Sequence, residues 1–293
     1  MTVMVTGASG LVGRTLVPML AERDEVRACV RRPEAAEPLR ALGAKVAVGR
    51  TDDVEALAEV LRRVYTLVHL VGGPNQPDDA ETMSANHRST LIALAAAREA
   101  DVRRFILISA PGAAIDAPDV YLRAKGLAEE AVTESGLEYA IVRSTHAYGL
   151  GGLWFTSIVE GALASPSFVV GDGTQPVAPI FARDLAAVIA AADDHARTLA
   201  GTWALEGPDV MTAAGLVARL TADHAAPMAL DAASASSRLS ETLSTAVHPS
   251  ATRFFALPSR ADAPDAAAAF GVDRTSLDEG LRRTMERAAV AGR

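Results

Sequence analysis

The repeated alternation of short β-branched runs with longer helical patterns limits how this chain can fold more than any other feature. Apolar runs rich in Val, Ile and Leu recur through the first half, and the segments between them carry apolar residues at three-to-four spacing. Short strands separated by such helices form parallel sheets with helical crossovers. We predict strands at 2–6, 25–31, 45–48, 66–71, 104–109 and 138–143, and helices at about 11–22, 34–42, 53–63, 80–100 and 120–135.

The regular alternation ends near residue 145, where Gly- and Pro-containing stretches break the chain into shorter elements. The fold class that we predict is α/β, with a doubly wound parallel sheet in residues 1–145. A smaller lobe, mostly for substrate binding, is expected in residues 146–293 and is interleaved with the end of the sheet. In this half we expect helices at 182–195, near 212–221 and at 275–290, a strand at 201–205, and either helix or loop at 231–251.

The bulk composition disfavours several classes of partner. The chain has a formal net charge of −8 and no dense Lys/Arg tract, so we do not expect a nucleic-acid partner. The single Cys29 lies in a predicted strand and cannot form an intramolecular disulfide, which suits the cytoplasm. The sequence has no run apolar enough to span a membrane and no ligand spacing typical of a metal site. We therefore expect a cytoplasmic protein that has neither a membrane-spanning segment nor a metal site.

A glycine-rich turn follows the first predicted strand. The stretch VMVTGASGLVG has glycines at every third position from residue 7, between a strand and a helix. Such a turn lets the backbone approach a pyrophosphate at a helix N-terminus, although glycines also occur in ordinary strand-to-helix turns. We predict dinucleotide binding here, by Gly7, Ser9, Gly10, Leu11, Val12 and Gly13.

The end of the second predicted strand bears on the choice of cofactor. An NAD site of this kind usually has a carboxylate there, about 20 residues past the glycines, but this sequence has Arg31 and Arg32. A guanidinium group suits a 2′-phosphate, so we predict that NADP(H) is preferred over NAD(H). The alternative is that both arginines simply solvate a strand end.

Two further segments extend the predicted nucleotide site. Asp52 and Asp53 follow the third strand, where they are equally suited to bind the adenine amino group or to cap the next helix. Gly72 and Gly73 follow the fourth strand, where the absence of a side chain lets the backbone pass close to the adenosine ribose and pyrophosphate. We assign Asp52, Gly72 and Gly73 to the cofactor.

A candidate catalytic group follows the fifth strand. Ser109 ends that strand, Tyr121 comes twelve positions later, and Lys125 lies one helical turn further on, on the same face. Carbonyl reduction needs a proton for the developing alkoxide, and a neighbouring cation favours ionisation of a tyrosine and lowers its pKa. We predict that Tyr121 donates the proton, Ser109 binds the substrate oxygen and Lys125 binds the nicotinamide ribose. A tyrosine and a lysine at this spacing also arise by chance.

Longer stretches of the chain resemble one known group of proteins. Ser109 with the Tyr-x-x-x-Lys pair resembles the catalytic triad of the short-chain dehydrogenase/reductase superfamily. The runs EEAVTESGLEYAIVRSTHAYG, PVAPIFARDLAAVIAAA and GTWALEGPDVMT are similar to its atypical or extended, NmrA-like and isoflavone-reductase-like members. Ser144 stands where that pattern commonly has proline. The resemblance implies a Rossmann fold, a cofactor role for Lys125 and a monomer or homodimer.

The segment after the sixth strand is predicted to face the nicotinamide and the substrate. We assign Thr145 and His146 to the cofactor, and we expect His146, Tyr148, Trp154 and Phe155 to line an apolar or aromatic-accepting pocket together with Ser109 and Tyr121. The alternative is that the aromatic side chains form the core of the smaller lobe and that His146 is structural.

These observations favour an NADP(H)-dependent reductase of a small, apolar or aromatic carbonyl, quinone or conjugated double bond. Two alternatives remain open. One is a non-catalytic NADP(H)-binding redox sensor of NmrA type, which has no need of a proton donor beside the nicotinamide. The other is a cofactor-retaining isomerase, epimerase or lyase.

Overall fold

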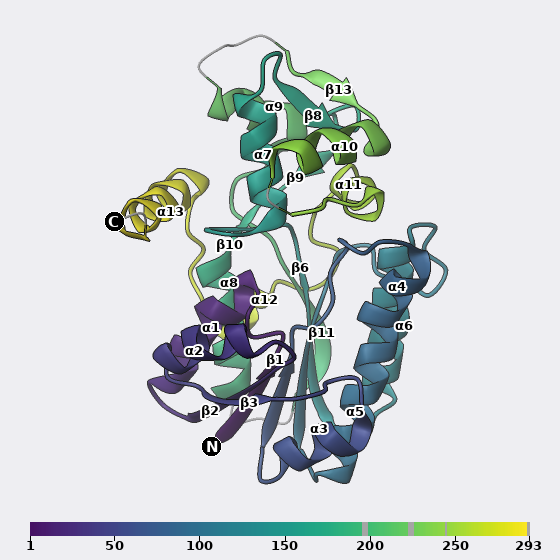
Figure 1. The fold of residues 1–293 in the computed structure, drawn as a ribbon, viewed down its shortest axis with the longest axis vertical. Helices are drawn as coiled ribbons and strands as arrows, with labels where there is room; N and C mark the ends of the chain where they lie inside the picture. The colour runs from purple at the N-terminus through teal and green to yellow at the C-terminus, as the bar shows by residue number, and fades with distance from the viewer. Residues whose placement is uncertain (195–198, 222–225, 244, 292–293) are drawn as a thin grey trace.

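A computed structural model describes residues 1–194, 199–221, 226–243 and 245–291 (Figure 1). Its main sheet is parallel throughout and has the order β11-β6-β5-β4-β1-β2-β3. The doubly wound parallel sheet predicted from the sequence is therefore confirmed. Its strands are β1 (Thr2–Thr6), β2 (Glu25–Val30), β3 (Lys45–Val48), β4 (Thr66–His69), β5 (Arg104–Ser109), β6 (Glu138–Ser144) and β11 (Ala200–Leu205).

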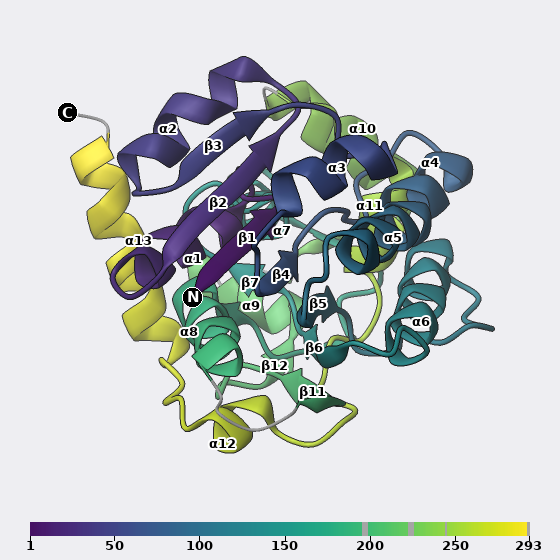
Figure 2. The same ribbon diagram turned by 90° about the horizontal axis from the view of Figure 1, so that it is seen from below.

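The strand order reverses between β1 and β4, and such a point opens a crevice at the carboxyl ends of the strands. Helices cover both faces of the sheet (Figure 2). One face has α1 (Leu11–Ala21), α2 (Ala36–Ala41), α8 (Ala182–Asp194) and α12 (Ala266–Phe270), and a 3₁₀ turn, η1 (Pro33–Ala35), precedes α2. The other face has α3 (Val54–Leu61), α5 (Ser89–Glu99) and α6 (Val120–Thr133).

Side chains of the central strands alternate between two buried cores. In β1, Val3 and Val5 pack in the cluster that contains Leu16 of α1, whereas Met4 packs in the cluster that contains Leu57 of α3. All five residues are nearly inaccessible to solvent. Burial on both faces explains why these strands read as continuous apolar runs and not as an alternating pattern.

The helix predicted over 80–100 is interrupted. The chain forms α4 (Asp79–Met83), a π-helical turn η2 (Ser84–Arg88) and then α5. The extra residue in such a turn changes which side chains face inward, and here Asn86 is fully buried. This polar side chain supports the loop after β4, as described below.

The smaller lobe lies beyond the carboxyl ends of the strands (Figure 1). Residues 231–251, for which the sequence pattern allows either helix or loop, contain α10 and the start of α11. The lobe consists of α7 (Leu153–Leu163), α9 (Ala213–Leu220), α10 (Ala232–Thr242), α11 (Pro249–Phe255) and the short strands β7 (Ala147–Tyr148), β8 (Phe168–Val170), β9 (Pro176–Val177), β10 (Ile180–Phe181), β12 (Met211–Thr212) and β13 (Met228–Leu230).

The second half also returns to the main sheet, because α8 packs on α1 and β11 pairs with β6. The chain ends in α13 (Leu277–Ala291). Helices α7, α11 and α12 were not predicted from the sequence. Residue 195, the predicted end of the helix observed as α8, lies outside the described residues. The division at residue 145 stays a prediction.

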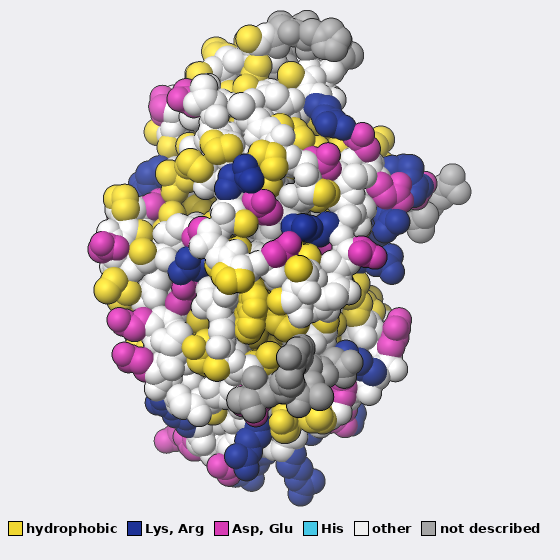
Figure 3. Space-filling view, turned by 180° about the vertical axis from the view of Figure 1, so that it is seen from behind, with side chains coloured by type: hydrophobic (Ala, Val, Ile, Leu, Met, Phe, Trp, Pro, Cys, Tyr) yellow, Lys and Arg dark blue, Asp and Glu magenta, His cyan; other side chains and the backbone are white. Residues whose placement is uncertain are grey.

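Charged side chains of both signs are interspersed over the described part of the face in Figure 3. Among the described residues, every helix is too short or too polar to cross a membrane. The cytoplasmic location and the oligomeric state stay predictions.

Candidate active site

The turn between β1 and α1 packs so closely that two of its positions require glycine. Gly7 has a φ of +71°, and a Cβ there would lie 2.6 Å from the carbonyl carbon of Leu70. A Cβ on Gly13 would lie 2.4 Å from the Cα of Ala8, so a larger residue would push α1 away from the turn. Helix α1 begins directly after Gly10, and its first turn offers backbone N–H groups to a phosphate.

A cavity of about 250 Å³ opens beside this turn and reaches the end of β2; we call it the β2 cavity. Ser9, Gly72, Arg31 and Arg32 are among its lining residues, and none of the described lining residues carries a carboxylate. Both arginines are exposed, and Arg32 forms an exposed ion pair with Glu34 at 3.6 Å. Two guanidinium groups therefore lie where an NAD site commonly has its acid.

The two aspartates after β3 have different surroundings. The Asp53 carboxylate accepts a hydrogen bond from the backbone N–H of Ala56 at 2.9 Å and so caps α3. Asp52 is exposed, does not line the β2 cavity, and forms an ion pair with Arg50 at 3.1 Å. The hydrogen bond from Arg50, and to a smaller extent the charge of Arg31, lowers the pKa of Asp52. Its assignment to the cofactor stays a prediction.

Asn86 fixes the glycine loop after β4. Its Oδ1 accepts a hydrogen bond from the N–H of Gly73 at 2.8 Å, and its Nδ2 donates to the carbonyl oxygens of Gly73 and Thr82 at 3.1 and 2.8 Å. A Cβ on Gly72 would lie 2.3 Å from Asn86 Oδ1, so the amide and the glycine fit each other closely. No local pattern indicates a role for Asn86, because it lies within an apparently regular helical stretch of the sequence.

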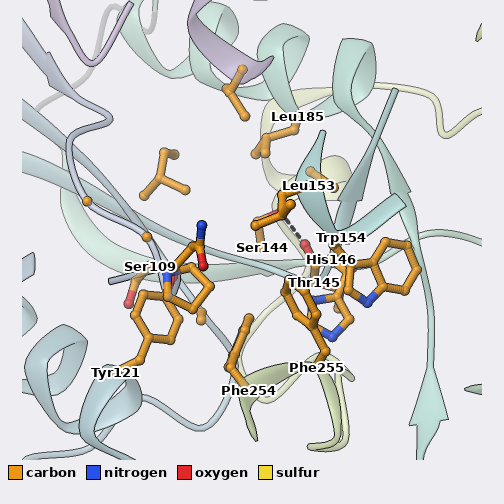
Figure 4. Close-up of a pocket in the computed structure, with 18 of the residues that line it drawn as sticks. Ser109, Tyr121, Ser144, Thr145, His146, Leu153, Trp154, Leu185, Phe254 and Phe255 are labelled. Carbon is orange, nitrogen blue, oxygen red and sulfur yellow. Dashed lines mark hydrogen bonds between the residues drawn. The ribbon is translucent and has the colours of Figure 1, made fainter. Parts of the chain in front are cut away.

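A second cavity, of about 350 Å³, opens at the carboxyl end of β5 (Figure 4); we call it the β5 cavity. It is lined by Ser109, Tyr121 and the segment after β6, and by aromatic side chains of the smaller lobe. Gly72 lines both this cavity and the β2 cavity. The two cavities therefore share a wall residue at the β4 loop.

Ser109 and Tyr121 approach the β5 cavity from different elements. Ser109 is buried at the end of β5, and its Oγ has no hydrogen-bond partner within the described chain. Tyr121 lies in the first turn of α6, which is capped by the Asp119 carboxylate. The Tyr121 ring is 8% exposed and makes an edge contact with Phe254, with ring centroids 4.6 Å apart. An unpartnered buried hydroxyl beside a phenol is a site that a polar ligand atom can complete.

The surroundings of Tyr121 correct one expectation. A neighbouring lysine was expected to lower its pKa, but burial, with a further contribution from Asp119, raises the pKa above its ordinary value of 10. Lys125 is not among the causes of this shift. The sequence could not reveal the burial, which disfavours the phenolate. Tyr121 therefore stays protonated at neutral pH, as a proton donor must.

Lys125 lies one turn further along α6 and is 5% exposed. Burial lowers its pKa to about 8, and Glu129 opposes that shift. Glu129 itself forms an ion pair with Arg143 at 2.7 Å. Burial, together with the charge of Lys125, lowers the pKa of His69 in β4 to about 3. Lys125 does not line the β5 cavity, so its contact with a cofactor ribose stays a prediction.

The burial of Lys125 predicts a pH-dependent stability. The cofactor-free folded protein releases this proton near pH 8, whereas the unfolded chain holds it until about 10.5. The Lys125 contribution to the free energy of unfolding therefore rises with pH between these values. We expect Lys125→Met to be more stable than the wild type at pH 7, and the difference to shrink from pH 8 to 10.5 in denaturant titrations.

Lys45 provides the control because its side chain is 72% exposed in β3. Lys45→Met is expected to show no comparable change over this pH range. A Lys125→Met difference that stays constant between pH 8 and 10.5 would contradict the assignment.

His146 is held in an aromatic environment at the far side of the β5 cavity (Figure 4). Its ring stacks on Trp154 at 4.7 Å and meets the edge of Phe254 at 5.1 Å. Burial lowers the pKa of His146 to about 3, so the ring is neutral at physiological pH. Its Nε2 has no hydrogen-bond partner within the described chain. Thr145 also lines the cavity, and its Oγ1 donates to the Ala178 carbonyl oxygen at 2.6 Å.

The three aromatic residues predicted for the pocket are divided between pocket and core. Trp154 lines the β5 cavity. Tyr148 is fully buried, and its ring packs against those of Phe155 and Phe181, so Tyr148 and Phe155 lie in the core of the smaller lobe and not on the cavity wall. Phe254 and Phe255 of α11 also line the cavity, and neither was predicted from the sequence.

Hydrogen bonds tie the β4 loop to the segment that leads into α11. Asn75 Nδ2 donates to the Ala246 carbonyl oxygen at 2.9 Å, and Asn75 Oδ1 accepts from the N–H of His248 at 2.8 Å. Ser250 Oγ donates to the Gln76 carbonyl oxygen at 2.7 Å. This tie brings the aromatic residues of α11 over the strand ends.

The sequence is similar to those of proteins that bind NAD(P)H. A family model described as NAD(P)H-binding matches residues 7–149. The (4-alkanoyl-5-oxo-2,5-dihydrofuran-3-yl)methyl phosphate reductase of Streptomyces griseus is 31% identical over 220 residues, 75% of this chain and 72% of that protein. The chain belongs to this NAD(P)H-binding family. Its membership agrees with the glycine turn and confirms the prediction that the chain belongs to an NAD(P)H-binding family.

Other family relatives include an NAD(P)H azoreductase of Xenophilus azovorans, 28% identical over 72% of each chain. Subunit 9 of the mitochondrial NADH dehydrogenase [ubiquinone] 1 alpha subcomplex of Arabidopsis thaliana is 29% identical over 71% of this chain and 54% of its own. The crystal structure of UDP-glucose 4-epimerase from Thermotoga maritima has a TM-score of 0.75 over both whole chains at 18% identity, which shows the shared fold. Two of these relatives are named as reductases, and the chain shares their NAD(P)H-binding family.

Proposed function

We propose that this protein is an NADP(H)-dependent reductase of a small, uncharged carbonyl, quinone or conjugated enone, with Tyr121 as the proton donor. The observation that carries the proposal is the convergence of Ser109 and Tyr121 on one cavity, which shares Gly72 with the cavity beside the glycine-rich turn. The unpartnered Ser109 hydroxyl and the protonated phenol are the two groups that a substrate oxygen needs beside a hydride donor.

The residues act as follows in carbonyl reduction. A bound NADPH would supply a hydride, that is, a proton with two electrons, to the carbonyl carbon. Ser109 donates a hydrogen bond to the carbonyl oxygen and so stabilises its developing negative charge. Tyr121 transfers its proton to that oxygen as the C=O π bond breaks, giving the alcohol. The raised pKa of Tyr121 favours reprotonation of its phenolate from water afterwards.

The lining of the β5 cavity supports an uncharged substrate. None of its described lining residues carries a charged side chain, and Trp154, Phe254 and Phe255 present aromatic surface. The name of the Streptomyces griseus relative includes a phosphate group, for which this cavity offers no cation. No cation in the cavity would offset the cost of removing a phosphate from water, so we expect this protein to prefer neutral aromatic substrates.

NADPH consumption with a panel of quinones and aromatic ketones tests the proposal. We expect turnover with at least one neutral member of the panel and none with a matched phosphate-bearing compound. Tight NADPH binding without turnover on any neutral member would instead favour the non-catalytic sensor.

The tie between Asn75 and the α11 segment gives a separate prediction. Asn75→Ala removes two hydrogen bonds that hold this segment over the β5 cavity. At about 1 kcal/mol for each bond, or about 2 kcal/mol together, we expect the substrate KM to rise about 30-fold, with the Kd of NADPH within about twofold of the wild type. Steady-state kinetics and fluorescence titration with NADPH measure the two quantities.

Arg253→Ala is the matched control. It removes the ion pair between α11 and Asp79, whose side chains are 47% and 67% exposed, and such pairs contribute little. We expect a KM near that of the wild type. Equal losses of substrate and NADPH affinity in Asn75→Ala would point to general loosening of the fold and contradict a positioning role.

A further inference from the structure

A third cavity, of about 240 Å³, lies beside α1 and is separate from the sites described above; we call it the α13 cavity. Leu11 lines this cavity and Val12 lines the β5 cavity, so the first turn of α1 lies between them. The remaining wall comes from the loop after β7, the start of α8 and one face of α13. Segments far apart in the sequence therefore enclose one space.

The charges around this space are of one sign. Arg14 of α1, Arg183 of α8 and Arg287 of α13 all line the cavity, and none of its described lining residues carries a carboxylate. A Cβ on Gly151, another lining residue, would lie 2.9 Å from Nη2 of Arg14. The Arg14 guanidinium group itself therefore reaches the cavity wall.

These arginines differ from their neighbours in lacking acidic partners. Within the described chain, none of the three has a carboxylate within 4 Å, whereas Arg282 and Arg283 of the same α13 both pair with Glu279. Asp184 follows Arg183 directly, but its carboxylate is buried and accepts hydrogen bonds from Thr275. All three arginines are exposed, so an anion from solvent can reach them, and their convergence favours an anion in a chain of net charge −8.

We propose that the α13 cavity binds a compact phosphate-class oxyanion, either a free inorganic phosphate or the phosphoryl group of a small metabolite. Guanidinium groups bind phosphate oxygens through charge-assisted, paired hydrogen bonds. The ligand is coupled to the cofactor turn, because Arg14 also donates a hydrogen bond to the carbonyl oxygen of Ser9, which lines the β2 cavity.

Calorimetric titration tests the site with inorganic pyrophosphate, at constant ionic strength and with the protein saturated with NADP⁺. Saturation fills the cofactor's own pyrophosphate cradle, so the remaining heat reports a second site. We expect saturable binding to the wild type and at least about tenfold weaker binding to the Arg183→Ala, Arg287→Ala double variant. Glycerol 3-phosphate, titrated in parallel, distinguishes a preference for phosphomonoesters from one for free inorganic anions.

Arg282→Ala is the matched control, because Arg282 lies on the same helix and has acidic partners. It is expected to bind pyrophosphate as the wild type does, and NADP⁺ titration and thermal melts establish that each variant is folded. Three results would overturn the proposal: no saturable binding to the wild type, equal binding to the double variant, or binding that vanishes when NADP⁺ is present. The last would assign the anion to the glycine turn.

Discussion

Tyr121→Phe is expected to lower kcat by about 10²- to 10⁴-fold, the usual contribution of a positioned acid. The substitution removes only the hydroxyl and preserves the ring that packs edge-on against Phe254. The Kd of NADPH is therefore expected to stay within about twofold of the wild type, so the loss lies in the chemical step. Rapid-mixing kinetics of NADPH oxidation and fluorescence titration measure the two effects.

Tyr139→Phe provides the control for this substitution. Tyr139 lies in β6 and packs against the core cluster on the α3 face of the sheet, away from the β5 cavity. It is expected to retain nearly full activity. If Tyr121→Phe is as active as the wild type, Tyr121 is not the proton donor, although hydride transfer itself could still occur.

Arg31→Ala is expected to weaken NADPH binding about 10- to 100-fold while changing NADH binding little. The loss corresponds to about 1.5–3 kcal/mol for charge-assisted hydrogen bonds to the 2′-phosphate, which NADH lacks. Arg31 lines the β2 cavity, and none of the described lining residues is an acid that would favour the 2′-hydroxyl of NADH. Equilibrium titrations with both cofactors measure the change in preference.

Arg32→Ala is expected to have a smaller effect, because Arg32 also lines the cavity but has Glu34 as an ion-pair partner. The outcome that would reverse the cofactor assignment is a wild type that prefers NADH, together with an unchanged preference in Arg31→Ala.

The main sheet could be predicted because each of its strands is marked by a local apolar run in the sequence. Strands buried on both faces read as apolar runs, and β1, β3 and β5 begin and end at the predicted residues. The predicted second strand ends one residue late, and the observed end at Val30 leaves Arg31 directly at the sheet edge. The predicted fourth strand also ran too far, because its last two residues precede Gly72 and already belong to the loop.

The substrate side could not be predicted in the same way. Phe254 and Phe255 reach the β5 cavity only because α11 folds back over the strand ends, and no local pattern indicates that contact. Asn75 and Asn86 act through hydrogen bonds to backbone groups, which single-residue identity does not reveal. Tyr148 was assigned to the pocket with the lobe core as the alternative, and the sequence could not decide between them because aromatic residues serve cavity walls and cores equally well.

The pKa of Tyr121 could not be inferred from spacing either. A lysine one turn away suggested a lowered value, but the extent of burial depends on how α6 packs against α11 and the smaller lobe. The sequence spacing predicts that Tyr121 and Lys125 share one helix face, but the surroundings of each group depend on the tertiary packing.

The most direct test of the central claim is transfer of deuterium from NADPH labelled at C4 of the nicotinamide. Each of the two C4-labelled forms is incubated with a neutral quinone or aromatic ketone that is turned over, and the products are analysed by mass spectrometry. We predict that NADPH is oxidised and that one deuterium is transferred from only one of the two labelled forms. If the product is a quinol whose label exchanges with water, a ketone or enone is used as the substrate instead. Tight NADPH binding with neither oxidation nor transfer to any such substrate would contradict the account and assign the fold to cofactor binding alone.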